Sequence, residues 1–458
     1  MATKGDEREM TKLAKLPGLA AALAVLALPA FAQDAAPAAE AMAEAVAPIV
    51  DKGDVAWMMT ASLLVLFMII PGLALFYGGL VRTKNMLSIL MQTTMITAVV
   101  MIIWVLYGYS FAFGGSTSPY WGGTGKIFLS GVTIDSLAAT FTDGVMLPEY
   151  VFIAFQMTFA AITPALFVGA FAERIKFSAV ILFTVLWVTV VYFPIAHMVW
   201  DGSGLIFNWG AVDFAGGTVV HINAGVTALV AAFVVGPRIG YGKDNMAPHS
   251  MTLTMVGAAM LWVGWFGFNA GSNLEATAGA TLALLNTFAA TAAAIVSWVA
   301  VEKIVRGKAS GLGAASGMVA GLVAITPACG TSGPVGAIAL GFVVSPIAYF
   351  FVTKVKAMFH YDDSLDVFGV HGVGGIVGAI GTGILMAPSL GGVGGDDFSI
   401  AAQVVIQIKA VLLTIVWAGV GSLVLLYIVK AITGLRVEPD DERQGLDLTT
   451  HGESAYHS

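Results

Sequence analysis

Two histidines in long apolar stretches are the residues of this sequence best suited to chemistry. His221 lies in Asp213 to Gly225, DFAGGTVVHINAG, and His371 lies in Asp363 to Gly375, DSLDVFGVHGVGG. An aspartate, a valine, a histidine and a glycine recur at the same offsets in both stretches. Imidazole donates or accepts a proton near neutral pH, and an ionisable residue in a membrane helix is by default a functional candidate. The pair therefore predicts a pathway on which protons are exchanged.

The alternative for each of these histidines is a structural role in which the ring bonds a neighbouring carbonyl. Two histidines at matching positions favour the functional interpretation. His197 has no such counterpart and is predicted to be structural. The other four histidines, His249, His360, His451 and His457, fall in segments predicted to be cytoplasmic.

The composition is that of a polytopic membrane protein. Of 458 residues, 58% are hydrophobic and 11% are charged, and the mean hydropathy is +0.88. A soluble domain has roughly 25% charged residues. Apolar segments long enough to cross a hydrocarbon core of about 30 Å predict eleven transmembrane helices. Their expected spans are 55–77, 87–111, 150–171, 178–199, 217–235, 251–269, 280–303, 311–326, 335–353, 368–386 and 402–432.

The chain ends carry separate signals. Residues 1–32 are typical of a signal peptide, because basic residues precede an apolar run that ends in Ala30-Phe31-Ala32. The alternative is an uncleaved amphipathic leader. An outward-facing linker is expected at 33–53, the transmembrane domain at 54–433 and a cytoplasmic regulatory tail at 434–458.

Basic residues gather in alternate loops, which predicts the orientation of the chain. The positive-inside rule places the mature N-terminus outside and the C-terminus in the cytoplasm. Five helices in each half predict an all-α fold with a five-plus-five inverted repeat and an extra C-terminal helix, 402–432. The two histidines then fall on the fifth and tenth helices. Substrate sites of such repeats lie near the midplane, where the halves meet.

The neighbours of the histidines indicate the kind of cargo. Small residues at helical spacing, among them Gly225 and Gly375, allow the two helices to approach closely. We expect no Asp, Glu, Lys or Arg near the midplane of any predicted helix. A charge at that depth costs at least about 2.5–3.5 kcal/mol, so the pathway disfavours an intact ion. The predicted cargo is a small molecule that sheds a proton and regains it.

Three aromatic residues could attract a cation to the mouth of the pathway. These are Trp200, at the outer end of the fourth helix, and Phe159 and Phe268, within the third and sixth. A cation over an aromatic face gains about 0.5–2 kcal/mol, which recruits without trapping. Belts of aromatic residues at the membrane interface and packing against lipid are the alternative explanation.

Six motifs resemble those of the ammonium transporter (Amt/Mep/Rh) family, with the likeness closest to bacterial Amt proteins. They are DFAGGTVVHINAG, DVFGVHGVGGIVG, GWFGFNAGS, VGAFAERIKFSAV, PIAHMVW and TPACG, and the resemblance extends over the chain from about Asp54. It implies eleven transmembrane helices, a homotrimer in the bacterial plasma (inner) membrane and one narrow pore in each subunit.

The resemblance also assigns roles to residues. His221 and His371 become the pore and proton-relay pair, Phe159 and Phe268 the hydrophobic gate, Trp200, Ser272 and Phe159 the external ammonium site, and Asp213 the support behind it. Asp201 departs from the glycine run expected after Trp200. The tail is similar to the family's cytoplasmic C-terminus, which couples subunits and meets PII-type nitrogen regulatory proteins.

These observations predict an ammonium transporter, not an enzyme, that takes ammonium or methylammonium and conducts NH3. Both an electrogenic mechanism, with separate proton transfer, and passive passage of NH3 are consistent with the sequence. Two alternatives remain open: an ammonium sensor that signals through its tail, and a passive Rh-like gas channel. A membrane metalloenzyme is a third reading, but His221 and His371 lack the further ligands of a metal shell. We expect no metal, no cofactor and no nucleic-acid partner. Membrane lipid is expected to surround the transmembrane helices.

Overall fold

The computed structural model describes residues 48–456. The predicted signal peptide, the linker up to residue 47 and His457 lie outside the described residues. Of the linker predicted at 33–53, residues 48–51 precede the first described helix, which begins at Lys52 and is capped by Asp51.

The described chain is almost entirely helical, as predicted. Its α-helices are α3 (Lys52–Phe67), α4 (Ala74–Leu80), α5 (Met86–Ile103), α6 (Tyr109–Phe113), α7 (Glu149–Phe171), α8 (Phe177–Trp187), α9 (Phe193–Trp200), α10 (Leu205–Asn208), α11 (Asn223–Val235), α12 (Met251–Gly271), α13 (Ala278–Arg306), α14 (Gly311–Ile325), α15 (Pro334–Phe350), α16 (Lys356–Phe359), α17 (Val373–Leu385), α18 (Ile400–Thr433) and α19 (Pro439–Gln444). Seven π-helical segments extend or join them, Met68–Leu73, Trp104–Gly108, Val188–Tyr192, Gly217–Ile222, Phe351–Val355, Phe368–Gly372 and Asp447–His451. Strands β1 (Leu137–Ala139) and β2 (Met146–Pro148) form an antiparallel pair in which Ala138 lies opposite Leu147.

Ten helical stretches in the described part of the chain are long and apolar enough to cross a membrane. They are Lys52–Leu80, Thr83–Phe113, Glu149–Phe171, Phe177–Asn208, Gly217–Val235, Met251–Gly271, Ala278–Arg306, Pro334–Phe359, Phe368–Leu385 and Ile400–Thr433. The remaining predicted span, 311–326, coincides with α14, a shorter apolar helix of 15 residues. A polytopic all-α membrane protein is therefore confirmed, whereas the count of eleven and the inverted repeat stay predictions.

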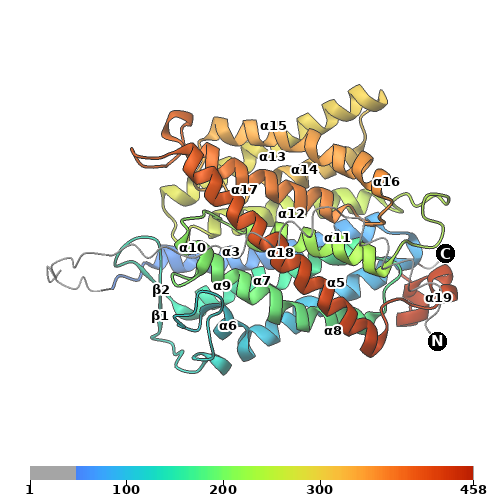
Figure 1. Ribbon diagram of the computed structural model, residues 1–458, viewed down its shortest axis with the longest axis horizontal. Coiled ribbons are helices and arrows are strands. Elements are labelled where there is room, and N and C mark those ends of the chain that lie inside the picture. The colour runs from blue at the N-terminus through green and yellow to red at the C-terminus, as the bar shows by residue number, and fades with distance from the viewer. Residues whose placement is uncertain (1–47, 457–458) are drawn as a thin grey trace. The chain divides into compact units, whose positions relative to one another are not determined.

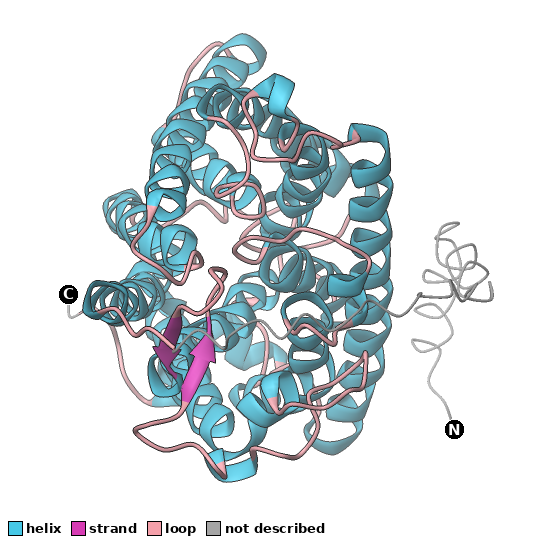
Figure 2. Ribbon diagram, turned by 90° about the vertical axis from the view of Figure 1, so that its left-hand side faces the viewer, coloured by secondary structure: helices cyan, strands magenta, loops and turns pink. Residues whose placement is uncertain are grey.

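The long helices run side by side between two ends that differ in character (Figure 1). One end, called here the tail face, consists of residues 81–85, 172–176, 236–250, 360–367 and 434–456, which are joined by hydrogen bonds. The other end, the loop face, contains residues 114–148, 201–216, 272–277 and 386–399, and the two strands lie on it (Figure 2). The tail face contains Arg82, Arg174, Arg238 and Arg436, which belong to the alternate basic loops of the sequence. The side of a membrane that this face meets stays a prediction.

Polar side chains start several of the long helices. Asp51 accepts the N–H of Gly53 at 2.6 Å, and Ser250, Ser310 and Ser399 each accept an N–H from the first turn of α12, α14 and α18. The first N–H groups of a helix have no partner within it, so a capping oxygen stabilises the helix by about 1 kcal/mol. These caps fix where the spans begin.

A buried ion network ties the tail face together. Arg238 donates to both oxygens of Asp362, at 2.9 and 2.8 Å, and to Glu173 at 3.2 Å, and Arg82 pairs with Glu173 as well. Burial acts to raise the pKa of Glu173 and of Asp362, but the guanidinium groups outweigh it and hold both pKa values below their usual range. The network joins segments from both halves of the chain.

Helix α11 and the segment that carries His371 are in backbone contact. A Cβ built on Gly225 would lie 2.2 Å from the Cα and N atoms of Gly372, and one built on Gly375 would lie 2.9 Å from the Gly217 carbonyl oxygen. Close approach of this kind requires glycine on both sides. The close packing predicted from the small residues is therefore present.

We predict that Gly225→Ala lowers the thermal unfolding midpoint of the detergent-solubilised protein. The new methyl group meets backbone, which cannot rotate away, so the two helices must separate at a cost of about 1–3 kcal/mol. Gly419→Ala is the matched control, because its Cβ would meet only Val226 at 3.5 Å. An equal midpoint for both variants would contradict the proposed contact.

Candidate functional site

The two histidines predicted as a pair are in direct contact in the interior. Nδ1 of His221 lies 3.3 Å from Nδ1 of His371, and the ring centroids are 5.3 Å apart at an interplanar angle of 31°. Both side chains are buried, at 1% and 3% exposure. One ring must therefore donate its Nδ1–H to the other, because two lone pairs would repel at this distance.

Each histidine lies in a π-helical segment at the start of its helix. Such wide turns occur often at functional sites. Asp213 stabilises the first of them, Gly217–Ile222, because its carboxylate accepts the N–H groups of four successive residues, Gly216 to Val219, at 2.6–3.0 Å. Burial raises the pKa of Asp213, although these four donors act in the opposite direction. Asp213 therefore organises the helix that carries His221.

Aromatic rings form a continuous row from the loop face to the histidine pair. Trp200 packs edge-on to Phe159 at 5.8 Å, Phe159 stacks on Phe268 at 4.1 Å and 19°, and Phe268 lies 5.9 Å from the ring of His221. The two phenylalanines are 1% and 0% exposed. We call Trp200, Phe159, Phe268, His221 and His371 the ring row. Five of the residues predicted as recruitment site, gate and relay thus form one series of ring contacts.

Two polar contacts shape the outer end of the ring row. The Trp200 indole N–H donates to the carbonyl of Asp213 at 2.9 Å, which orients its ring. Ser272 donates its hydroxyl proton to the carbonyl of Phe268 at 2.8 Å. The lone pairs of the Ser272 oxygen remain able to accept a hydrogen bond. Ser272 is thereby joined to the backbone of Phe268, and its oxygen keeps the acceptor capacity that the predicted external site requires.

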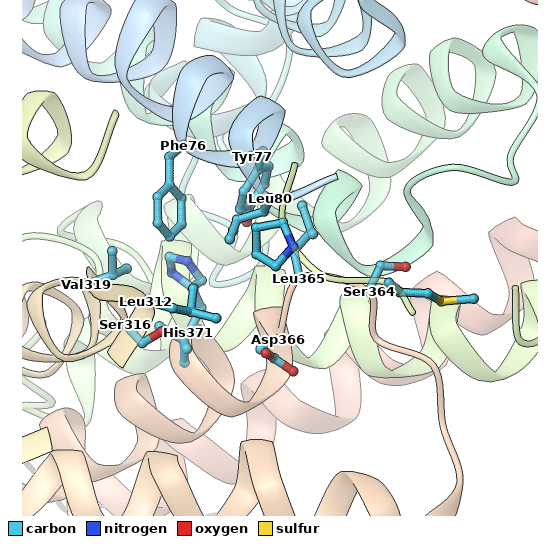
Figure 3. A pocket seen from close by; sticks show the side chains of 13 residues that line it. Phe76, Tyr77, Leu80, Leu312, Ser316, Val319, Ser364, Leu365, Asp366 and His371 are labelled. Carbon is cyan, nitrogen blue, oxygen red and sulfur yellow. The ribbon is translucent and has the colours of Figure 1, made fainter. Parts of the chain in front are cut away.

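A cavity of about 160 Å³ reaches the inner end of the ring row from the tail-face side (Figure 3). His371 lines it together with Phe76 and Leu80 of α4, and Ser364 and Asp366 contribute polar groups. The row therefore leads from the loop face, through the paired imidazoles, to a cavity among the loops of the tail face.

His197 has the contacts expected of a structural histidine, because both ring nitrogens lie against backbone carbonyls. Its two ring nitrogens lie 2.8 and 2.7 Å from the carbonyl oxygens of Ala112 and Ser118. By contrast, Nε2 of His221 has no hydrogen-bond partner within the described residues. The carbonyl-bonded alternative thus describes His197, as predicted, but not the pair.

Two aromatic residues next to the pair were missed by the sequence interpretation. The Trp265 ring stacks on His221 at 5.2 Å and 28°, and its indole N–H donates to Thr326 at 3.0 Å. Phe76 lines the cavity beside His371. The spacing of three between Trp265 and Phe268 places both on one face of α12 and could have indicated the first. Nothing in the sequence near Phe76 marks it.

Metal binding finds no support in residues 48–456, because no three His, Cys, Asp or Glu side chains there are grouped so as to hold an ion. The paired imidazoles thus lack the further ligands that a metal shell needs.

Asp363 is the counterpart of Asp213 but is less well satisfied. Its Oδ2 accepts the Phe368 N–H at 2.8 Å, while Oδ1 is buried without a hydrogen-bond partner in the described chain. Burial raises the pKa of Asp363 to about 6, against the opposing effect of Lys356. Ionisation of Asp363 is thus less favourable in the folded protein than in the unfolded chain.

We predict a pH-dependent difference in stability between the wild type and Asp363→Asn. A raised folded-state pKa stabilises the protein below the unfolded value of 3.8, and this contribution is lost as the pH rises through about 6. The unfolding midpoint of the wild type relative to the variant should fall between pH 4 and 7, by on the order of 3 kcal/mol in free energy. Unfolding curves at matched pH measure it, and a constant difference would contradict the assignment.

Comparison with known proteins gives consistent matches. The Ammonium Transporter Family model matches residues 56–456. An ammonium transporter of Aquifex aeolicus (strain VF5) is 46% identical over 89% of this chain and 94% of its own length, and one of Bacillus subtilis (strain 168) is 45% identical over 88% and 98%. Among solved structures, Sensor Amt Protein has a TM-score of 0.80 at 30% identity, covering 87% of this chain and 98% of its own, and Saccharomyces cerevisiae Mep2 has 0.77 at 32%, covering 85% and 88%.

Proposed function

The chain belongs to the ammonium transporter family, and from this membership we propose that it takes up ammonium through the ring row. The observation that carries the proposal is the buried contact of two imidazoles behind stacked phenylalanines. NH4+ is recruited beside Trp200, Phe159 and Ser272, and NH3 crosses to the cavity beside His371.

Recruitment rests on weak and reversible contacts. The faces of Trp200 and Phe159 give a cation about 0.5–2 kcal/mol, and the oxygen of Ser272 accepts one of its N–H groups. Moving the intact charge to membrane depth costs at least about 2.5–3.5 kcal/mol. Passage of the neutral molecule is therefore favoured. One N–H bond of NH4+ breaks with its electron pair left on nitrogen.

The released proton follows its own route along the histidine pair. In the tautomer in which His221 donates its Nδ1–H to His371, His221 accepts the proton at Nε2, which has no hydrogen-bond partner within the described residues. The Nδ1 proton then moves to Nδ1 of His371, whose Nε2–H is released toward the cavity. The rings afterwards return to their first tautomers. Charge thus crosses with NH3, and transport is electrogenic.

The wider assembly follows from the family resemblance. We include in the proposal eleven transmembrane helices with an inverted repeat, a homotrimer in the inner membrane, a cleaved signal peptide and a tail that meets PII-type proteins. The tail at 434–456 already contacts its own subunit, where Asp447 accepts the N–H groups of Leu87 and Ser88. The sensor alternative is not favoured, because the curated relatives reported above are named transporters.

We predict that proteoliposomes containing the protein accumulate labelled methylammonium, and that His221→Gln and His371→Gln each lower this uptake by about a hundredfold. Glutamine keeps a hydrogen bond but cannot relay a proton, and proton transfer by a positioned group is worth at least that factor. His360→Asn is the control, because His360 is exposed and lies outside the ring row. Wild-type uptake and selectivity in both glutamine variants would remove the histidines from the mechanism, and ammonium binding without uptake would favour the sensor.

We further predict a transient inward current when such proteoliposomes receive an ammonium pulse. The relay moves one positive charge with each NH3, whereas an equal potassium pulse has no proton to shed and should give no current. Solid-supported membrane recordings measure both. NH3 flux without current would reject the relay and leave a passive Rh-like channel.

A further inference from the structure

The side-chain amide of Gln407, on α18, forms hydrogen bonds with the backbone of Val212, the residue before Asp213. Its Oε1 accepts the N–H of Val212 at 2.7 Å, and its Nε2 donates to the carbonyls of Val212 at 2.7 Å and of Ala379 at 2.9 Å. The residue is 1% exposed. Its amide thus holds both polar groups of one residue and a carbonyl of α17, in a setting where lost hydrogen bonds are not replaced by water.

Val212, which Gln407 holds, is directly followed by a residue that contacts the ring row. The next residue is Asp213, whose carbonyl accepts the Trp200 indole N–H and whose carboxylate accepts the four N–H groups that start the His221 segment. A shift of Val212 would therefore displace the cation-facing indole and the first turn below His221 together.

Helix α18 is well placed to set this position. It crosses obliquely over α11 and α17, which continue from the two histidine segments (Figure 1). Ala379, the third partner of Gln407, lies on α17, the helix that follows His371. One amide side chain therefore connects the entrance of the His221 segment with the helix of the other histidine.

We propose that Gln407 is a positioning residue for the outer cation site: through Val212 and Asp213 it fixes the Trp200 ring and the start of the His221 segment. The helix that lies outside the two predicted repeats thereby sets the geometry inside them. The inference rests on the proposed function for its transport readout, but its structural readout is independent of transport.

The test compares Gln407→Met with Gln403→Met in the full-length protein. Methionine matches glutamine in length and removes all three hydrogen bonds. Gln403 lies one turn earlier on α18 and is partly exposed, and it donates to the Gly210 carbonyl at 2.9 Å and only loosely to Gln407, at 3.4 Å. Two readouts are taken: amide hydrogen exchange over residues 209–220, and KM and Vmax for methylammonium uptake.

We expect Gln407→Met to speed exchange in 209–220 by about tenfold and to raise KM by a similar factor, with a smaller change in Vmax. Gln403→Met should leave both readouts near wild type. If Gln407→Met does not fold, Gln407→Asn carries the test, because its shorter amide reaches fewer partners. Unchanged exchange with wild-type KM overturns the proposal, and so does faster exchange with wild-type KM, because Gln407 would then stabilise the segment without positioning the cation site. Absence of uptake by the wild type refutes the proposed function, and exchange alone then decides the role of Gln407.

Discussion

The contact between the imidazoles of His221 and His371 is the constraint on which the rest of the site depends. At 3.3 Å between Nδ1 atoms the rings must share one proton, so each ring determines the tautomer of the other. The backbones must also approach closely, and Gly225 and Gly372 permit this. A side chain at either glycine would separate the rings and end the sharing. Close packing of the two helices is therefore necessary for the two imidazoles to share a proton.

The two aspartates that precede the histidine segments accept different numbers of backbone N–H groups. Asp213 receives four N–H groups and is further fixed through Trp200 and the peptide of Val212, whereas Asp363 receives the Phe368 N–H and keeps one oxygen unpaired among the described residues. The first turn of the His221 segment thus receives more hydrogen bonds from its aspartate than the first turn of the His371 segment. A cation–π contact supplies only about 0.5–2 kcal/mol, so the orientation of the Trp200 ring, which is fixed through Asp213, matters to the proposed site.

Much of the architecture and most of the candidate site could be predicted from the sequence. Hydropathy gave the spans, because each apolar run must cover a fixed membrane thickness, and repeated motifs identified the histidines. Trp265 and Phe76 could not be found in this way, because packing of distant helices decides which aromatic residues meet an imidazole. Gln407 was missed for the same reason: its partners Val212 and Ala379 are remote in sequence. The count of eleven depended on α14, whose 15 residues are short for a span.

The free energies of a cation at an aromatic face and at membrane depth determine which species can pass along the ring row. Aromatic faces return about 0.5–2 kcal/mol to a cation, less than the roughly 2.5–3.5 kcal/mol or more that a charge costs at depth. In the proposed pathway Trp200 and Phe159 hold a cation at the mouth, and the rings further in, Phe268 and Trp265, offer only the same small energy, which does not make up the difference. A potassium ion has no means of becoming neutral. Ammonium has one, since it can leave a proton behind, and behind the phenylalanines lie two side chains suited to carry that proton.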